Sequence, residues 1–165
     1  MTTIRRMNAD DATAVADLLA SSWRRTYEAT MGVDKLERAI ASWGQPQSLA
    51  RESGDEEIIA FVAEEDGGAI VGHAMAFMKD DRSVWLERLH VAPGRFGTGL
   101  AADLLHAVLA AHAGLPSIGL EVLEGNDRAI RFYEKHGFVV VERKNACGSV
   151  DGVPTLVMRK ILPRA

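Results

Sequence analysis

The chain has 165 residues, of which 47% are hydrophobic and 25% are charged, and its formal net charge is −4. This length is typical of one globular domain, and the acidic balance excludes an overall basic field that would attract nucleic acid or an anionic membrane. A single cysteine, Cys147, excludes an internal disulfide and a multi-cysteine metal site, so we expect a reduced thiol and no metal.

The beginning of the chain gives an expectation about location. The residues MTTIRRMNADD lack the continuous apolar segment of a signal peptide. No apolar run of the sequence approaches the ~18 residues that a membrane-spanning helix needs. We therefore expect a cytoplasmic protein with neither a membrane nor a nucleic acid as partner.

The first part of the chain predicts a strand followed by two helices. Residues 3–7 form the strand, and Asp10 or Asp11 can cap a helix whose apolar side chains recur at helical spacing. A second helical stretch covers residues 35–43 and is broken at Gly44 and Pro46.

Strand patterns, interrupted by two more helices, fill the rest of the chain. Residues 57–65 and 69–78 predict a hairpin joined by a DGG turn, in which Gly72 marks a bulge or a close approach. The later elements are a strand at 83–91, a helix from Leu100, a strand at 117–123, a helix from Asn126 to His136 that Gly137 ends, and strands at 138–144 and 154–162. This order predicts a mixed sheet with helices packed on it, in an α/β or α+β fold.

The stretch HVAPGRFGTGL (90–100) has the physical properties of an anion site. It joins a strand to a helix N-terminus, where unpaired backbone N–H groups and the helix dipole favour negative charge. Glycines let the backbone approach a ligand closely. The amides expected to face an anion belong to Gly97, Thr98, Gly99, Leu100 and Ala101, although a glycine turn that merely connects two elements has the same appearance.

Two other phosphate-binding loops fit this stretch less well. A P-loop needs Lys and Ser or Thr after its last glycine, but Leu100 follows Gly99. A dinucleotide fingerprint matches Gly97, Gly99 and Ala102, and Glu121 lies about 20 residues further on. Meandering strands precede the loop, however, and too few βα units follow it for a doubly wound sheet.

Two longer motifs resemble those of the GNAT superfamily of acetyl-coenzyme A-dependent N-acetyltransferases. They are LERLHVAPGRFGTGLAADLL (86–105) and LEVLEGNDRAIRFYEKHGF (120–138), and the stretches 4–23 and 151–162 also resemble the ends of family members. The resemblance implies one acetyltransferase domain over residues 1–165, with a mostly antiparallel central sheet of about seven strands flanked by about four helices. It also allows a homodimer, because many relatives dimerise.

The resemblance implies a set of contacts with acetyl-CoA. The pantetheine arm would bond main-chain groups at Leu89, His90 and Val91, and the Val91 N–H would serve as the oxyanion donor. Asn126 would combine a helix cap with a cofactor contact, next to Ala129. Phe96 stands where the family has Gln or Arg, with Arg95 one place earlier. We expect that slot to act through its backbone amide, so that donor binding survives.

The resemblance and the residue chemistry together suggest catalytic groups. Tyr133 matches the motif tyrosine that protonates the leaving thiolate, and Glu87 is the candidate base, directly or through a water. Strand alternation places Glu87 beside apolar neighbours, although an ion pair with Arg88 or another arginine would explain it equally well. His90 is a second candidate base. We expect the other histidines to be structural: His73, His106, His112 and His136.

The expected reaction is acetyl transfer from acetyl-CoA to a primary amine of a small molecule or peptide, by direct attack in a ternary complex. Trp23, Tyr27 and Met31 would shape the acceptor pocket, although aromatic side chains at this spacing are more often core. Two alternatives stay open at this point. One is a CoA-binding module without catalysis, suggested by Phe96, and the other is a nucleotide-dependent oxidoreductase.

Overall fold

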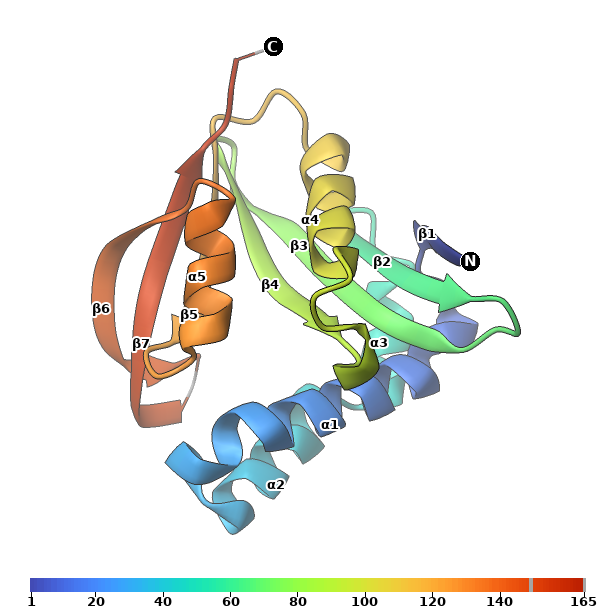
Figure 1. Ribbon diagram of the computed structural model, residues 1–165, viewed down its shortest axis with the longest axis horizontal. Coiled ribbons are helices and arrows are strands. Elements are labelled where there is room, and N and C mark those ends of the chain that lie inside the picture. The colour runs from blue at the N-terminus through green and yellow to red at the C-terminus, as the bar shows by residue number, and fades with distance from the viewer. Residues whose placement is uncertain (149, 165) are drawn as a thin grey trace. The chain divides into compact units, whose positions relative to one another are not determined.

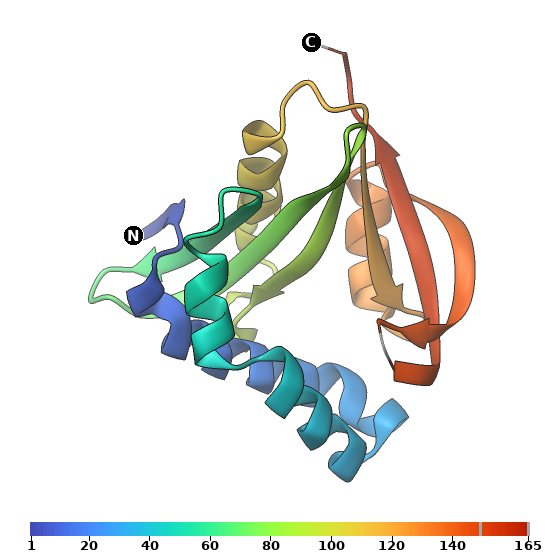
Figure 2. The ribbon, with the colours of Figure 1, turned by 180° about the vertical axis from the view of Figure 1, so that it is seen from behind.

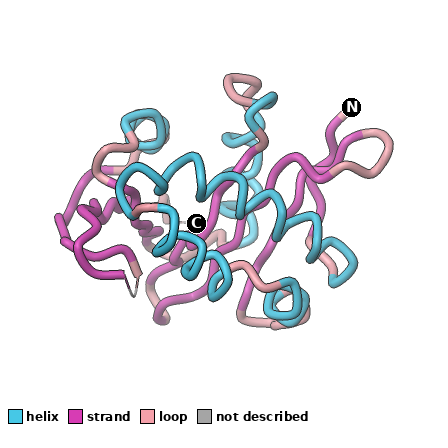
Figure 3. Tube along the Cα trace, turned by 90° about the horizontal axis from the view of Figure 1, so that it is seen from below, coloured by secondary structure: helices cyan, strands magenta, loops and turns pink. Residues whose placement is uncertain are grey.

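The computed structural model describes residues 1–148 and 150–164, and their strands have the hydrogen-bonded order β1-β2-β3-β4-β5-β7-β6 (Figure 1). Figure 3 distinguishes helices from strands along the trace. The elements are β1 (Thr2–Arg6), the 3-10 turn η1 (Ala9–Asp11), α1 (Ala12–Met31), α2 (Val33–Trp43), α3 (Pro46–Glu52), β2 (Ile58–Glu65), β3 (Ile70–Asp80), β4 (Ser83–Val91), the 3-10 turn η2 (Pro93–Arg95), α4 (Leu100–Ala111), β5 (Ser117–Leu123), α5 (Asp127–Lys135), β6 (Val139–Cys147) and β7 (Val150–Ile161).

The predicted mixed, mostly antiparallel sheet is confirmed. β4 and β5 run parallel, whereas β2 is antiparallel to both β1 and β3, and β7 is antiparallel to both β5 and β6. This arrangement differs from the doubly wound parallel sheet of a dinucleotide-binding fold. In the described part of the chain, no helix is both long and apolar enough to cross a membrane.

The chain divides into two compact units. The N-terminal unit comprises Met1–Phe77 and Arg88–His112, and the C-terminal unit comprises Met78–Glu87 and the residues from Ala113 onward. The division falls within β3 and β4, so each of these strands contributes one part to each unit. The single-domain organisation expected from the sequence stays a prediction.

Helices cover both faces of the strands in the N-terminal unit. Figures 1 and 2 show α4 on one face and α3 on the other. Gly72 lies under α4, where an added Cβ would come within 2.9 Å of Leu104 Cδ1 and 3.1 Å of Ala63 Cβ. The sheet register also shifts beside it, between Ala63 and Glu64. The predicted bulge and close approach at Gly72 are therefore both present.

Helix α3 is absent from the predicted elements. The sequence analysis treats Pro46 only as a helix breaker, but Pro46 is the first residue of α3. Proline suits this position because its fixed φ is helical and its missing N–H would have no intrahelical acceptor. Leu49 then anchors the short helix, since its side chain is fully buried.

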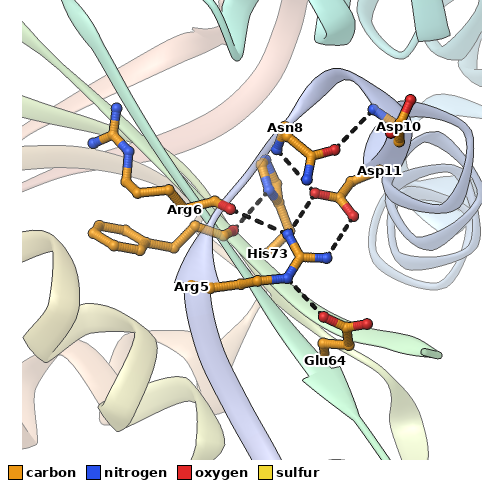
Figure 4. Close-up of polar contacts among 8 residues, drawn as sticks. Arg5, Arg6, Asn8, Asp10, Asp11, Glu64 and His73 are labelled. Carbon is orange, nitrogen blue, oxygen red and sulfur yellow. Dashed lines mark hydrogen bonds and ion pairs between the residues drawn. The ribbon is translucent and has the colours of Figure 1, made fainter. Parts of the chain in front are cut away.

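Asp11, one of the two predicted caps of the first helix, is the N-cap residue of α1, but its side chain makes no cap hydrogen bond to that helix. The Asn8 side chain accepts the Asp10 N–H at 2.9 Å, and Asp11 Oδ2 accepts the Asn8 N–H at 2.9 Å, which forms a reciprocal capping box around η1 (Figure 4). Arg5 also binds Asp11 through two contacts of 2.8 Å and Glu64 through one of 2.6 Å. The Arg5 guanidinium is the main reason why the pKa of Asp11 is lowered. Asp11 therefore ties the start of α1 to β1.

The C-terminal unit is built on β5, β7 and β6 together with the first residues of β4. Ser83–Leu86 pair in register with Ser117–Leu120. The Trp85 ring packs closely against Gly119, where an added Cβ would be 3.0 Å from Trp85 Cζ3. Helix α5 begins at its predicted cap, Asn126, whose side chain accepts the Ala129 N–H at 3.3 Å. Gly137, with φ +88°, follows the helix as predicted.

Candidate active site

The loop between β4 and α4 has open space around two of its glycines. Gly97 and Gly99 have φ values of +76° and +88°, and an added Cβ at either would meet no atom within 4 Å. Gly99 is the N-cap of α4, so Leu100 and Ala101 provide amides of the first helical turn, which have no intrahelical acceptors. This geometry permits an anionic group to approach the backbone closely.

The backbone amide of Phe96 is already used within the loop. It donates to the Pro93 carbonyl at 3.2 Å, and Arg95 N–H donates to Ala92 O at 2.9 Å, so both belong to the turn η2. The expectation that Phe96 contributes its amide therefore meets a competing intramolecular bond. The predicted amide of Thr98 is also used within the loop, because the N–H and the Oγ1 of this exposed residue both donate to the Arg95 carbonyl, at 3.4 and 2.7 Å.

His90, near the end of β4, forms a hydrogen bond with a serine of α1. His90 Nδ1 is 2.7 Å from Ser22 Oγ, and Ser22 lies buried on α1. The Trp23 ring meets the His90 ring edge-on, with centroids 6.2 Å apart. His90 itself is half-buried, and this burial, with the charges of Arg88 and Arg25, lowers its pKa to about 4. The imidazole is therefore neutral at neutral pH.

Buried charge on β4 belongs to Arg88, not to Glu87. The predicted strand alternation is correct, but Leu86 and Arg88 lie on the buried side, whereas Glu87 is exposed. Arg88 is 7% exposed and forms an ion pair with Glu52 of α3. This pair could not be predicted from the strand alone, because its partner lies on α3, a helix absent from the predicted elements. The feature of the sequence that could have indicated a buried ion pair is that Arg88 lies on the same strand face as the apolar Leu86.

His73 on β3 is a second buried polar group of the N-terminal unit. Its Nδ1 is 3.1 Å from the Phe61 carbonyl and must donate to it, so Nε2 carries a lone pair (Figure 4). Among the described residues, nothing hydrogen-bonds to Nε2, and the side chain is fully buried. Burial, with the charges of Arg88 and His90, lowers the pKa of His73 well below its usual value. The expected structural role fits this environment.

Glu87 lies in the C-terminal unit, and its carboxylate accepts a hydrogen bond from a side chain of the same strand. Trp85 Nε1 donates to Glu87 Oε2 at 2.9 Å, and Lys79 Nζ lies 4.2 Å from the centroid of the Trp85 ring. The carboxylate is exposed to solvent and, among the described residues, it accepts a hydrogen bond from Trp85 and forms no ion pair with an arginine. Its role as base stays a prediction.

Tyr133 is buried on α5 in an aromatic cluster. Its ring centroid is 5.3 Å from that of Phe132 and 5.4 Å from that of Phe138. Burial raises the pKa of Tyr133, so the phenol keeps its proton at neutral pH. This protonation state is the one that a general acid requires.

The acceptor candidates all lie on α1 of the N-terminal unit. Trp23 and Met31 are buried, and the Trp23 ring also packs edge-on against Trp43 with centroids 5.6 Å apart. Tyr27 is half-buried. The core interpretation therefore accounts for Trp23 and Met31, and a role in acceptor binding stays a prediction for all three.

The predicted site residues are divided between the two units. The N-terminal unit brings together Leu89, His90 and Val91, the loop residues Phe96 to Ala101, and Trp23, Tyr27 and Met31. The C-terminal unit holds Glu87, Asn126, Ala129 and Tyr133. Glu121, the acidic residue of the alternative dinucleotide motif, forms an ion pair with Lys144. No three His, Cys, Asp or Glu side chains of the described residues form a metal-binding group, and a metal-free site stays a prediction.

Comparisons with known proteins identify the family. Residues 13–138 match the Acetyltransferase (GNAT) family. A stretch of 75 residues is 49% identical to the uncharacterized N-acetyltransferase Rv2669 of Mycobacterium tuberculosis, covering 44% of this chain and 48% of that protein. The chain thus spans about half the length of the curated relatives that it matches.

Solved structures share the fold. PaiA N-acetyltransferase from Thermoplasma acidophilum, crystallised in complex with coenzyme A, matches with a TM-score of 0.81 and 20% identity over 98% of this chain and 99% of that chain. Ard1 from Thermoplasma volcanium matches with a TM-score of 0.74 and 24% identity over 99% of each chain. The chain belongs to the GNAT acetyltransferase family.

Proposed function

We propose that this protein is an N-acetyltransferase that moves an acetyl group from acetyl-CoA to a primary amine of a small molecule or peptide, by direct attack in a ternary complex. The observation that carries this proposal is the family match over residues 13–138, which includes β4, the glycine loop and the Tyr133 helix. The open backbone at Gly97 and Gly99 fits a phosphate-bearing donor.

Main-chain groups bind the donor in this proposal. The amides of Gly97, Gly99, Leu100 and Ala101 hold phosphate oxygens, and the backbone from Leu89 to Val91 bonds the pantetheine arm, with Asn126 and Ala129 as further contacts. When bound, acetyl-CoA supplies a thioester-activated acetyl group. The Val91 N–H donates to the carbonyl oxygen as negative charge develops on it.

Two side chains move protons in the proposed reaction. Glu87 takes a proton from the ammonium form of the amine, directly or through a water. The neutral nitrogen then attacks the acetyl carbon as the carbon–sulfur bond breaks, and it loses its second proton to solvent as the amide forms. Tyr133 gives its phenolic proton to the leaving thiolate. His90 is the competing base, because it is neutral and half-buried. Cytoplasmic location and dimerisation stay predictions from the sequence.

A panel of amines with a thiol-release readout tests this function. We expect acetyl-CoA-dependent thiol release with at least one amine, and a Tyr133→Phe variant that loses turnover more than donor affinity. Phe132→Tyr, which alters a ring contact of Tyr133 without removing its hydroxyl, is the matched control. Unchanged turnover in Tyr133→Phe would refute the role of Tyr133.

A CoA-binding module without catalysis is the second candidate. Phe96 favours it, since this position offers no polar side chain and its amide is bonded to Pro93. Calorimetric binding of CoA without thiol release across the whole panel would support this candidate and contradict the enzyme.

A further inference from the structure

The glycine loop has no phosphate-binding cation of its own. Phe96 occupies the slot where the family has Gln or Arg, and the residue is 37% exposed. Arg95, one place earlier, forms an ion pair with Glu65 at the end of β2. A donor phosphate at this loop would therefore meet backbone amides but no side-chain charge from the loop itself.

Helix α1 brings a cation to Phe96. The Arg25 guanidinium carbon lies 5.8 Å from the centroid of the Phe96 ring, within the range of a cation–π contact. Arg25 Nη1 also donates to Ser21 Oγ at 2.8 Å, one helical turn earlier, which orients the group. Its charge reaches the end of β4, because Arg25 contributes to lowering the pKa of His90.

Arg25 differs from its neighbours in having no carboxylate partner. Arg24, the next residue on α1, is bound to Glu37 by contacts of 2.7 and 3.0 Å, and Arg95 is paired with Glu65. Among the described residues, no carboxylate forms an ion pair with Arg25. A guanidinium over an aromatic ring keeps its N–H groups directed outward in its own plane, where they can bind phosphate oxygens in pairs.

We infer that Arg25 is the side chain that binds the phosphates of the donor at this loop, and that the Phe96 ring is the platform that holds it there. The inference rests on the proposed function, because it needs a CoA donor. It explains how the loop tolerates Phe96: the positive charge comes from α1 and not from the loop. Phe96 then acts through its ring, while its amide stays in the turn.

Calorimetric titration with CoA tests the inference without relying on activity. We expect Arg25→Ala to weaken CoA binding about tenfold or more, because a charge-assisted pair with phosphate is lost. Arg25→Lys should recover part of the affinity, since it keeps the charge but not the planar fork. Phe96→Leu should weaken binding about threefold by removing the platform. Arg24→Ala is the matched control and should bind like the wild type.

A rescue experiment separates a phosphate contact from a structural effect. In the double variant Arg25→Ala with Phe96→Arg, the cation returns to the loop, and we expect most of the CoA affinity to return. Pantetheine, which lacks phosphates, should bind wild type and Arg25→Ala equally. Equal CoA affinity of Arg25→Ala and wild type overturns the inference while leaving the function intact. Failure of the wild type to bind CoA overturns the proposed function itself.

Discussion

Strand β4 has two halves with opposite environments. Its first half, in the C-terminal unit, carries Glu87, which is exposed and accepts one hydrogen bond from Trp85. Its second half, in the N-terminal unit, carries Arg88 and His90, which are paired with Glu52 and Ser22. The two candidate bases are thus separated by only two residues, yet one is solvated and the other is fixed against a helix. Residue type alone does not decide which of them can act as the base.

The largest effect should come from removing the base. We expect Glu87→Gln to lower kcat/KM about 100-fold, because general-base catalysis contributes on that order. His90→Gln should lower it less than about tenfold, since that side chain would then only line the site. Steady-state kinetics of both variants with acetyl-CoA and the best amine give the ratio. A larger loss in His90→Gln reverses the assignment.

The next effect concerns stability and contrasts two glutamates. Glu52→Ala should lower the free energy of unfolding by about 3 kcal/mol, because it leaves the buried Arg88 charge unpaired. Glu87→Ala should lower it by less than about 0.5 kcal/mol, since the side chain is exposed. Urea unfolding monitored by circular dichroism measures both. Equal losses of unfolding free energy in the two variants would contradict the difference in environment between the two halves of β4.

Acid should destabilise the protein through its buried histidines. The pKa of His73 is lowered on folding, so below about pH 6.5 the unfolded chain takes up a proton that the folded chain does not. Stability due to this group is present above that pH and is lost as pH falls, by about 1.4 kcal/mol per pH unit. His90, whose pKa is also lowered, contributes to the same slope. Urea midpoints from pH 7 to 5 test this, and His73→Gln should flatten the slope.

The smallest effects come from removing one hydrogen bond from each candidate base. Trp85→Phe removes the donor to Glu87 and should change kcat/KM less than about threefold, because water replaces it at an exposed site.

Ser22→Ala removes the contact that fixes His90 Nδ1. We expect nitrogen NMR of the imidazole to show one tautomer in the wild type and a mixture in Ser22→Ala. Thr13→Ala, at an exposed position near the start of α1, is the control, and an unchanged tautomer in Ser22→Ala would contradict the contact.

The regular elements follow from local patterns and could be predicted. The strand at 83–91 and the strand at 117–123 have their predicted ends, and α5 lies between its predicted cap, Asn126, and Gly137. Side-chain periodicity and turn chemistry act over a few residues, so they are visible in the sequence. Helix α3 was not predicted, because a proline can end one helix and begin another, and the burial of Leu49 that stabilises α3 depends on tertiary packing.

The family, the order of strands along the chain and the glycine loop could all be predicted from neighbouring residues and motif spacing. Long-range packing sets which charges are buried and which cation reaches the loop. Arg88 meets Glu52, and Arg25 meets Phe96, across long stretches of chain. Such pairings arise only when packing brings distant segments together, and burial then gives them their energetic weight. Phe96 is therefore understood only with helix α1 beside it.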